Sequence, residues 1–377
     1  MKIVLFANTD WYLYNFRLSL ALALRDAGHE LLLISPPGPY GDKLIALGLR
    51  WEPIPMRRRS LNPIRELLFF WHLWRLLRRE RPSLVHGFTI KCAVYGSLAS
   101  RLAGVPARVS AVAGMGYVFT SEDRKARLLR PLVRALIRLA LDGHNSRLIL
   151  QNKDDVALAK AARLVEPARI RLIHGSGVNC TRFSPRLTSR APNEAMRVLF
   201  AARLLWDKGI AEYVEAAGHL LEENRNIKFI LAGEPDPGNP AAVPDATVLG
   251  WQAAGIVEWL GHVDDMPDLL ANIDLVVLPS YREGLPRSLV EAAACALPVI
   301  AADVPGCREV ITDRIDGLLV PVRDSMALAD AIRQLDDDSE LARRLGSAAR
   351  ESAMKNFNEQ IVIEQTVSVY DELLSTA

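Results

Sequence analysis

The chain has 377 residues, of which 50% are hydrophobic and 24% are charged. This balance is typical of a globular protein large enough for two cores, and it excludes a low-complexity chain. The net charge of +2 hides an asymmetry. Residues 1–180 hold 28 Lys and Arg against 13 Asp and Glu, a net charge of +15. The remaining residues hold 18 against 31, a net charge of −13. The first half is therefore expected to approach anionic surfaces.

The cysteines, the N-terminus and the apolar stretches of the sequence indicate the cellular compartment of the protein. The four cysteines are Cys92, Cys180, Cys295 and Cys307. They form no CxxC or Cys/His pattern, so we expect reduced thiols and no structural zinc. The N-terminus lacks the basic start and cleavage site of a signal peptide. The most apolar long stretch, Leu67–Leu77, is too short to span a bilayer. We therefore expect a cytoplasmic protein.

The first half of the chain alternates short apolar runs with helical patterns. Lys2–Phe6 predicts a strand, and Asn15–Ala27 has helical spacing that ends before Gly28, a residue suited to a C-cap. Further strands are predicted, in chain order, at Glu30–Ile34, Arg50–Ile54, Leu84–His86, Arg108–Ala111 and Leu148–Leu150. Strands that alternate with helices favour a parallel sheet with helices on both faces.

A segment containing Gly175, Gly177 and Pro185 interrupts this alternation and predicts a domain boundary. The pattern then restarts, with strands predicted at Arg197–Phe200, Ile227–Ala232, Ile256–Leu260, Leu275–Leu278 and Val299–Ala301 and helices at Ile210–Leu221, Arg287–Ala296 and Glu359–Ser375. We predict an α/β protein with two facing Rossmann-like domains, over residues 1–180 and 190–358. Open parallel sheets bind ligands outside the carboxyl ends of their strands, so a cleft between the domains is the expected site.

The strongest chemical signal lies in Leu278–Glu291. After the strand, a loop carries Glu283 and Gly284, and Pro286 suits the first turn of a helix. Free N–H groups at such a helix start stabilise phosphate. Two carboxylates, Glu283 before the helix and Glu291 inside it, are placed to hold hydroxyls of one ligand. The alternative is a capped helix with two solvent-exposed glutamates, because helix N-termini attract acidic residues.

A second segment, Ala202–Gly209, follows the strand Arg197–Phe200. It places Arg203 and Lys208 at the carboxyl end of a strand, where ligands bind. Paired cations neutralise the growing charge of a diphosphate leaving group without a metal. The alternative is that both are ordinary surface cations.

Together these segments resemble glycosyltransferase family 4, retaining enzymes of the GT-B type. The family motif is Glu, seven residues, Glu, here Glu283 and Glu291, joined to an upstream Arg/Lys pair, here Arg203 and Lys208. The segment 177–185 looks like the family's interdomain linker. The closing helix over 359–377 resembles the family helix that crosses back and completes the first domain. The resemblance therefore implies the GT-B architecture.

Several segments look like those of bacterial N-acetylgalactosaminyltransferases that extend undecaprenyl diphosphate-linked sugars. These segments are Tyr14–Arg17, Ser60–Pro63, Ala202–Gly209, Leu278–Gly284 and Gly306–Val310. Related enzymes of capsule and O-antigen assembly use similar motifs with other sugars. The resemblance implies transfer of an N-acetylhexosamine, with N-acetylgalactosamine favoured, from a UDP-sugar to a polyprenyl diphosphate-linked acceptor. Glucose, galactose and mannose are the alternative donor sugars.

The resemblance also implies residue roles. Glu283 contacts the donor sugar and Glu291 the ribose, while Arg203 and Lys208 hold the diphosphate. Further donor contacts are Gly284, Leu285, Pro286, Arg287 and Ser288, with His262 and Val263 near the nucleobase. No metal or cofactor is implied, because the Arg/Lys pair supplies the positive charge. One departure is Ala113, where many relatives carry a histidine in Val-His-Gly, so no role of that histidine is transferred.

Acceptor contacts are predicted at the strand ends of the first domain. The candidates are Asp10, Tyr14, Asn15 and Arg17 after the first strand, and Thr89 and Lys91 after the fourth. Arg17 and Lys91 are the candidates for the acceptor phosphates. Simple surface charge is the alternative for both.

Two basic segments, Arg57–Arg81 and Arg124–Arg138, interleave arginines with aromatic or aliphatic residues. Basic amphipathic helices bind anionic bilayers through buried apolar area and charge attraction, with about 1 kcal/mol for each cation near the surface. We therefore expect peripheral attachment to the inner face of the cell membrane. In one alternative the aromatics pack into the core and the arginines are solvated. Nucleic-acid binding is another, but no nucleic-acid module is visible.

Three functions of other classes are the alternatives to a transferase. A GT-B nucleotide-sugar epimerase would bind a similar donor but would need neither an acceptor nor a membrane face. A catalytically silent scaffold is opposed by the intact set Arg203, Lys208, Glu283 and Glu291. A sugar phosphorylase is disfavoured because no lysine stands out as a pyridoxal phosphate anchor.

Overall fold

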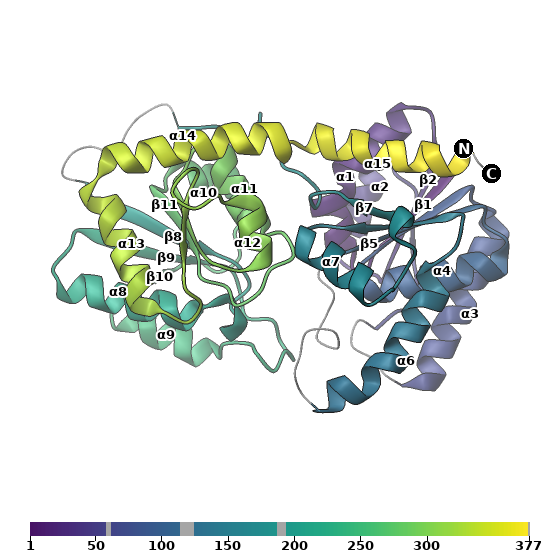
Figure 1. Cartoon of the computed structure of the whole chain (residues 1–377), viewed down its shortest axis with the longest axis horizontal. Helices are drawn as coiled ribbons and strands as arrows, with labels where there is room; N and C mark the ends of the chain where they lie inside the picture. Colours follow the sequence, from purple (N-terminus) through teal and green to yellow (C-terminus); the bar gives the residue numbers. More distant parts are fainter. Residues whose placement is uncertain (58–61, 114–123, 187–193, 376–377) are drawn as a thin grey trace. The chain divides into compact units, whose positions relative to one another are not determined.

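The computed structural model describes residues 1–57, 62–113, 124–186 and 194–375, with the side chains of 124–130 and 132 left out. The chain divides into two compact units (Figure 1). Unit 1 comprises Met1–Ser176 and Ile361–Ala377, and unit 2 comprises Gly177–Gln360. Each unit is built on its own parallel sheet, which confirms the predicted fold class.

Unit 1 holds a seven-stranded sheet with the order β3-β2-β1-β4-β5-β6-β7. Its strands are β1 (Lys2–Phe6), β2 (Glu30–Ser35), β3 (Trp51–Pro53), β4 (Leu84–Phe88), β5 (Ala107–Val112), β6 (Ser146–Leu150) and β7 (Ile170–Leu172). All neighbouring strands run parallel. Chain order reverses between β1 and β4, where Ile3 lies opposite both Leu31 of β2 and Leu84 of β4. Strand β7, which lies just before the segment with Gly175 and Gly177, was not predicted.

The helices of unit 1 cover both faces of this sheet. They are α1 (Asp10–Asp26), α2 (Gly41–Ala46), α3 (Pro63–Glu80), α4 (Ile90–Ala103), α6 (Arg124–Leu141), α7 (Lys153–Ala161), the short 3₁₀ turn η1 (Pro167–Arg169) and α15 (Glu359–Leu374). Helix α1 begins before the predicted Asn15 because the Thr9 hydroxyl accepts a hydrogen bond from the Tyr12 amide and caps an earlier turn. Helix α3 is capped in the same way by Asn62.

Alternate residues of the strands point to opposite faces of the sheet and pack into a separate apolar core on each face. On one face, Ile3 and Leu5 pack with α1 and with Val369 and Leu373 of α15. On the other face, Val4 and its neighbours pack with α3 and α4, and a further cluster joins α4 to α6 and α7. The yellow α15 in Figure 1 is thus part of unit 1, although it lies at the far end of the sequence.

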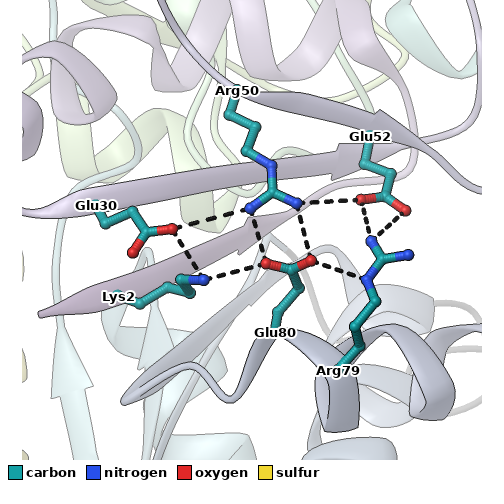
Figure 2. Close-up of polar contacts among 6 residues, drawn as sticks. All are labelled: Lys2, Glu30, Arg50, Glu52, Arg79 and Glu80. Atoms are coloured by element: carbon teal, nitrogen blue, oxygen red, sulfur yellow. Dashed lines mark hydrogen bonds and ion pairs between the residues drawn. The ribbon is translucent and has the colours of Figure 1, made fainter.

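Six charged residues connect the first residues of β1 and β2 and the region of β3 to the C-terminal end of α3 (Figure 2). They are Lys2, Glu30, Arg50, Glu52, Arg79 and Glu80. Glu80 is at the centre, with only 6% of its side chain exposed, and it lies 2.7 Å from Arg50, 2.9 Å from Arg79 and 3.1 Å from Lys2. The hydrogen bond from Arg50, followed by those from Lys2 and Arg79, lowers the pKa of Glu80 to about 2 against the opposing effect of burial. This cluster ties β1, β2, β3 and α3 together.

Unit 2 holds a six-stranded parallel sheet with the order β10-β9-β8-β11-β12-β13. Its strands are β8 (Met196–Ala201), β9 (Ile227–Ala232), β10 (Glu258–Trp259), β11 (Leu275–Leu278), β12 (Val299–Ala302) and β13 (Leu318–Val320). The helical elements are the 3₁₀ turn η2 (Trp206–Lys208), α8 (Ile210–Glu222), α9 (Asp245–Ala253), α10 (Met266–Ala271), α11 (Arg287–Ala294), α12 (Pro305–Val310), α13 (Ser325–Asp337) and α14 (Ser339–Asn356). One apolar core packs both faces of the sheet against these helices.

Candidate active site at the carboxyl ends of β8 and β11

The centre of the unit 2 sheet is the point where its strand order reverses. Strand β8 lies between β9, which follows it in sequence, and β11, which does not. Loops that leave two such strands diverge to opposite sides and open a crevice at their carboxyl ends, where open α/β sheets bind ligands. The loop after β8 carries Arg203 and Lys208, and the loop after β11 carries Glu283. The two segments singled out from the sequence therefore meet at one place.

Backbone contacts lock these two loops together. The Tyr281 amide donates to Asp207 O at 2.9 Å, and the Ser280 hydroxyl lies 3.2 Å from the same oxygen. Gly209 has φ +75°, and a Cβ there would collide with Pro279 O. A glycine is therefore required where the loop after β8 passes the end of β11.

The start of α12 (Pro305–Val310) packs against the loop that carries Glu283. A Cβ on Gly306 would lie 2.6 Å from Glu283 O and 2.7 Å from Gly284 O. Only the absence of a side chain allows the backbone of the Glu283 loop to rest there. The position of Glu283 is thus set by backbone packing on both sides of its loop.

Lys208 and Glu283 form an ion pair in which Nζ and Oε1 are 2.5 Å apart. The two side chains are 20% and 10% exposed, so the charges are partly shielded from water and strengthen each other. The residues are 75 positions apart in sequence. Sequence patterns suggested separate roles for them, and the fold brings them into direct contact.

Arg203 points to a different partner, one that sequence reasoning missed. Its Nη1 donates to Asp236 Oδ2 at 2.8 Å, and Asn239 Nδ2 donates to the same oxygen at 3.2 Å. Half of the Arg203 side chain is exposed, whereas that of Asp236 is 15% exposed. Asp236 follows β9, so the rule that picked out Arg203, a charged residue just beyond a strand, would have found it too.

Helix α11 begins at Arg287 with Pro286 as its N-cap residue, and no side chain caps its first turn. The amides of that turn are thus suited to an anion. Glu291 lies one turn inside the helix, is buried, and accepts a hydrogen bond from Arg287 Nε at 2.7 Å. Burial raises the pKa of Glu291, and the charge of Arg287 opposes the shift. Glu291 is therefore not a solvent-exposed glutamate.

The remaining donor-site residues lie on the loops around α11 and β10. Gly284, Leu285 and Ser288 are half-buried at the start of α11. The loop after β10 is held by a hydrogen bond from the Gly233 amide to Gly261 O at 2.7 Å. In this loop Val263 packs against the unit 2 core, and His262 Nε2 lies 3.3 Å from Asp264.

In unit 1, two predicted acceptor residues have structural partners. The Asp10 carboxylate is buried and accepts hydrogen bonds from the amides of Trp11, Tyr40 and Gly41, so it holds the start of α2. Arg17 is also buried. It donates to Gly175 O at 3.2 Å and to the Tyr12 hydroxyl at 3.0 Å.

The other four acceptor candidates lie near the surface of unit 1. Thr89 precedes α4 and has φ +71°, which is rare for a β-branched residue. Lys91 pairs with Glu66 of α3 at 2.9 Å. The Tyr14 ring centroid is 5.3 Å from that of Tyr40, and Asn15 donates to Trp11 O. Ala113, at the family histidine position, is exposed just after β5.

Comparison with known proteins places this geometry in a family. Residues 186–352 match the family described as glycosyl transferases group 1, and residues 2–153 match glycosyl transferase 4-like. The N,N'-diacetylbacillosaminyl-diphospho-undecaprenol alpha-1,3-N-acetylgalactosaminyltransferase of Campylobacter jejuni is 30% identical over 99% of both chains. An Escherichia coli UDP-Gal:alpha-D-GlcNAc-diphosphoundecaprenol alpha-1,3-galactosyltransferase is 26% identical over 91% of this chain and 89% of that one.

Solved structures agree on the fold. A glycosyltransferase from Rickettsia africae superposes with a TM-score of 0.80 at 18% identity, covering 100% of this chain and 99% of that chain. Anabaena HepE in complex with UDP superposes with a TM-score of 0.78 at 19% identity, covering 99% and 100%. With its sheets, its Arg/Lys pair and its spaced glutamates, the chain belongs to glycosyltransferase family 4 and is a glycosyltransferase of the GT-B fold.

Proposed function

We propose that the protein is a retaining enzyme that moves an N-acetylhexosamine, with N-acetylgalactosamine favoured, from a UDP-sugar to a polyprenyl diphosphate-linked sugar. The product would serve bacterial surface glycan or glycoprotein glycan assembly. The observation that carries the proposal is the Lys208–Glu283 ion pair at the reversal point of the unit 2 sheet. The acceptor class is supported by the Campylobacter jejuni and Escherichia coli relatives, whose names both specify an undecaprenyl diphosphate-linked sugar.

In the proposed reaction the acceptor hydroxyl attacks the anomeric carbon from the face that the diphosphate leaves. The new carbon–oxygen bond forms as the bond to the diphosphate breaks, and a departing phosphate oxygen takes the hydroxyl proton. Arg203 and Lys208 offset the negative charge that builds on the diphosphate. Glu283 orients the sugar and offsets positive charge at the anomeric carbon. This route requires no protein base and no metal.

The ion pair suggests how donor binding changes the site. Lys208 and Glu283 compensate each other's charge at 2.5 Å. A diphosphate carries more charge than one carboxylate and competes for Lys208. Glu283 is then released to accept hydrogen bonds from the sugar hydroxyls. Binding of the diphosphate by Lys208 and binding of the sugar by Glu283 would therefore be coupled.

Other donor contacts follow the geometry of the loops. The first-turn amides of α11 and the backbone of 284–288 would face the diphosphate and sugar. Glu291 would hold the ribose. Because its carboxylate is buried, it is expected to accept hydrogen bonds from a ligand in a fixed orientation. His262 and Val263 would lie near the nucleobase. A cavity of about 410 Å³, lined in part by Glu234 and Trp259, lies at the carboxyl ends of β9 and β10.

Among the acceptor candidates, the contacts of unit 1 favour some over others. Asp10 and Arg17 are buried with backbone partners, which favours structural roles for both. Lys91 is 17% exposed in its side chain and shares its charge with Glu66. We propose Thr89, Lys91, Tyr14 and Asn15 as the residues nearest the acceptor sugar and its diphosphate.

Peripheral attachment to the inner face of the membrane is part of the proposal. A polyprenyl-linked acceptor stays in the bilayer, so the enzyme must reach its surface. No helix in the described part of the chain is long and apolar enough to cross a membrane. The basic segments Arg57–Arg81 and Arg124–Arg138 would supply the attraction. Helix α3 lies within the first segment, of which residues 58–61 are outside the described part of the chain, and α6 contains the second.

A donor screen tests the proposed function. The enzyme would be incubated with UDP-N-acetylgalactosamine, UDP-N-acetylglucosamine, UDP-galactose or UDP-glucose and a polyprenyl diphosphate-linked N-acetylhexosamine. Released UDP, product mass and anomeric configuration would be measured. We expect acceptor-dependent release and an α-linked product with UDP-N-acetylgalactosamine. Galactose transfer is the second candidate, favoured by the Escherichia coli relative. Donor conversion without acceptor would instead indicate an epimerase and would refute the proposal.

A further inference from the structure

Helix α3 exposes a stripe of large apolar side chains on the side that faces away from the core. Ile64, Leu67, Leu68 and Trp71 are 70%, 69%, 55% and 44% exposed. Their spacing of three, one and three residues puts them on one face of the helix. The opposite face, with Phe69, Leu73, Leu76 and Leu77, is buried. Helix α3 (lower right in Figure 1) therefore has two apolar faces, of which only one is used by the fold.

The rest of the exposed face is cationic. Arg75 and Arg78 continue the stripe towards the C-terminal end, and Arg65 flanks its start. Among the described residues no carboxylate pairs with these three arginines. The two acidic residues of α3 are engaged elsewhere, since Glu66 pairs with Lys91 and Glu80 lies in the cluster of Figure 2. The outward face thus carries positive charge only.

Trp71 marks the boundary between the two halves of this face. The Arg75 guanidinium lies 4.6 Å from the Trp71 ring centroid. A hollow of about 380 Å³, lined in part by Trp71, His72 and Arg75, lies beside it. Amphipathic Trp rings and arginines are typical of the level where lipid headgroups meet acyl chains. A phosphate headgroup beside Arg75 would complement its charge.

We propose that the first half of α3 inserts into an anionic phospholipid bilayer, with Ile64, Leu67, Leu68 and Trp71 among the acyl chains and Arg75 and Arg78 at the headgroups. This deepens the membrane attachment proposed above, on which it rests, because it names the side chains that enter the bilayer and the face of α3 that carries them. A second protein is a poorer occupant, because stable interfaces use about 20–30 residues a side and this stripe offers four apolar side chains ringed by one sign of charge.

The experiment is flotation of the full chain with vesicles of phosphatidylethanolamine and phosphatidylglycerol. The double variant Leu67→Ser/Leu68→Ser is expected to lower the partition coefficient on the order of 100-fold, about tenfold for each leucine side chain that no longer leaves water. The matched control is Leu102→Ser in α4, whose side chain is 64% exposed but lies outside the stripe, and it should bind like the wild type. Ile64→Ser provides an independent variant of the stripe.

Salt and oligomeric state separate the competing explanations. Arg75→Gln/Arg78→Gln should weaken binding mainly at low salt, whereas the leucine variant should weaken it at low and high salt alike. Wild-type flotation of Leu67→Ser/Leu68→Ser and Ile64→Ser would overturn the proposal. It would also be overturned if these variants changed the solution mass of the protein and left flotation intact, because the stripe would then be a protein interface.

Transfer to a short-chain, water-soluble acceptor distinguishes this inference from the proposed function. The stripe variants should transfer sugar to such an acceptor at the wild-type rate, because none of the proposed donor or acceptor residues belongs to the stripe. A wild-type chain that binds vesicles and transfers nothing would sink the proposed function and leave the insertion of α3 standing. A wild-type chain that transfers sugar but does not bind vesicles would support the proposed transferase activity and overturn the insertion of α3.

Discussion

The support that Gly306 gives to the Glu283 loop leads to a sharp prediction for Gly306→Ala. An alanine Cβ would lie 2.6 Å from Glu283 O, whereas ordinary contacts begin at 3.4 Å, so the loop must move by about 0.8 Å. A misplacement of about 1 Å costs on the order of 100-fold in rate. The overpacking should also lower the free energy of unfolding by about 1–3 kcal/mol. We therefore expect a folded enzyme whose kcat falls on the order of 100-fold.

The assay is UDP release in the presence of donor and lipid-diphosphate acceptor, together with urea unfolding. Gly218→Ala is the matched control, because Gly218 lies within α8 and a Cβ there would meet nothing within 4 Å. It should keep the wild-type kcat and raise the free energy of unfolding by up to about 1 kcal/mol. The reasoning would be wrong if Gly306→Ala kept a kcat within about twofold of the wild type, or if both variants lost activity equally.

Three further predictions concern charged residues. Lys208→Ala and Glu283→Ala should each lose most turnover with an unchanged circular dichroism spectrum, and near-normal rates in either would refute their assignment. Asp236→Ala should lower kcat/KM about tenfold in the wild type but not in an Arg203→Ala background, because Asp236 acts by holding Arg203; additive losses would exclude that coupling. The lowered pKa of Glu80, about 2 against 4.5, means that its stabilisation is complete above pH 4.5 and is lost as the pH falls towards 2. Glu80→Gln should therefore cost about 2 kcal/mol at pH 7, less than the full pKa shift implies because its arginine partners are half exposed, and urea unfolding that shows the same cost at pH 2.5 would contradict this.

Local patterns were sufficient to predict most of the fold. Period-two and period-3.6 hydrophobicity depends only on neighbouring residues, so strands such as Ile227–Ala232 and Leu275–Leu278 were predicted with the ends that the structure has. The alternation of strands and helices then indicated parallel sheets, and the spaced glutamates with the Arg/Lys pair indicated the family. The short strands β7 and β13 were not predicted, whereas the equally short β3 was predicted as part of Arg50–Ile54.

The contacts of the candidate site depend on strand order, which no local pattern encodes. Placing β8 next to β11 brings Lys208 to Glu283, and placing it next to β9 brings Arg203 to Asp236. Packing between distant segments also buried Arg17, which donates a hydrogen bond to Gly175 O. The sequence had suggested Arg17 as a cation for the acceptor phosphates. By itself the sequence determined which residues follow which strand. Only the tertiary structure decided which charges meet, because that depends on packing between segments far apart in the chain.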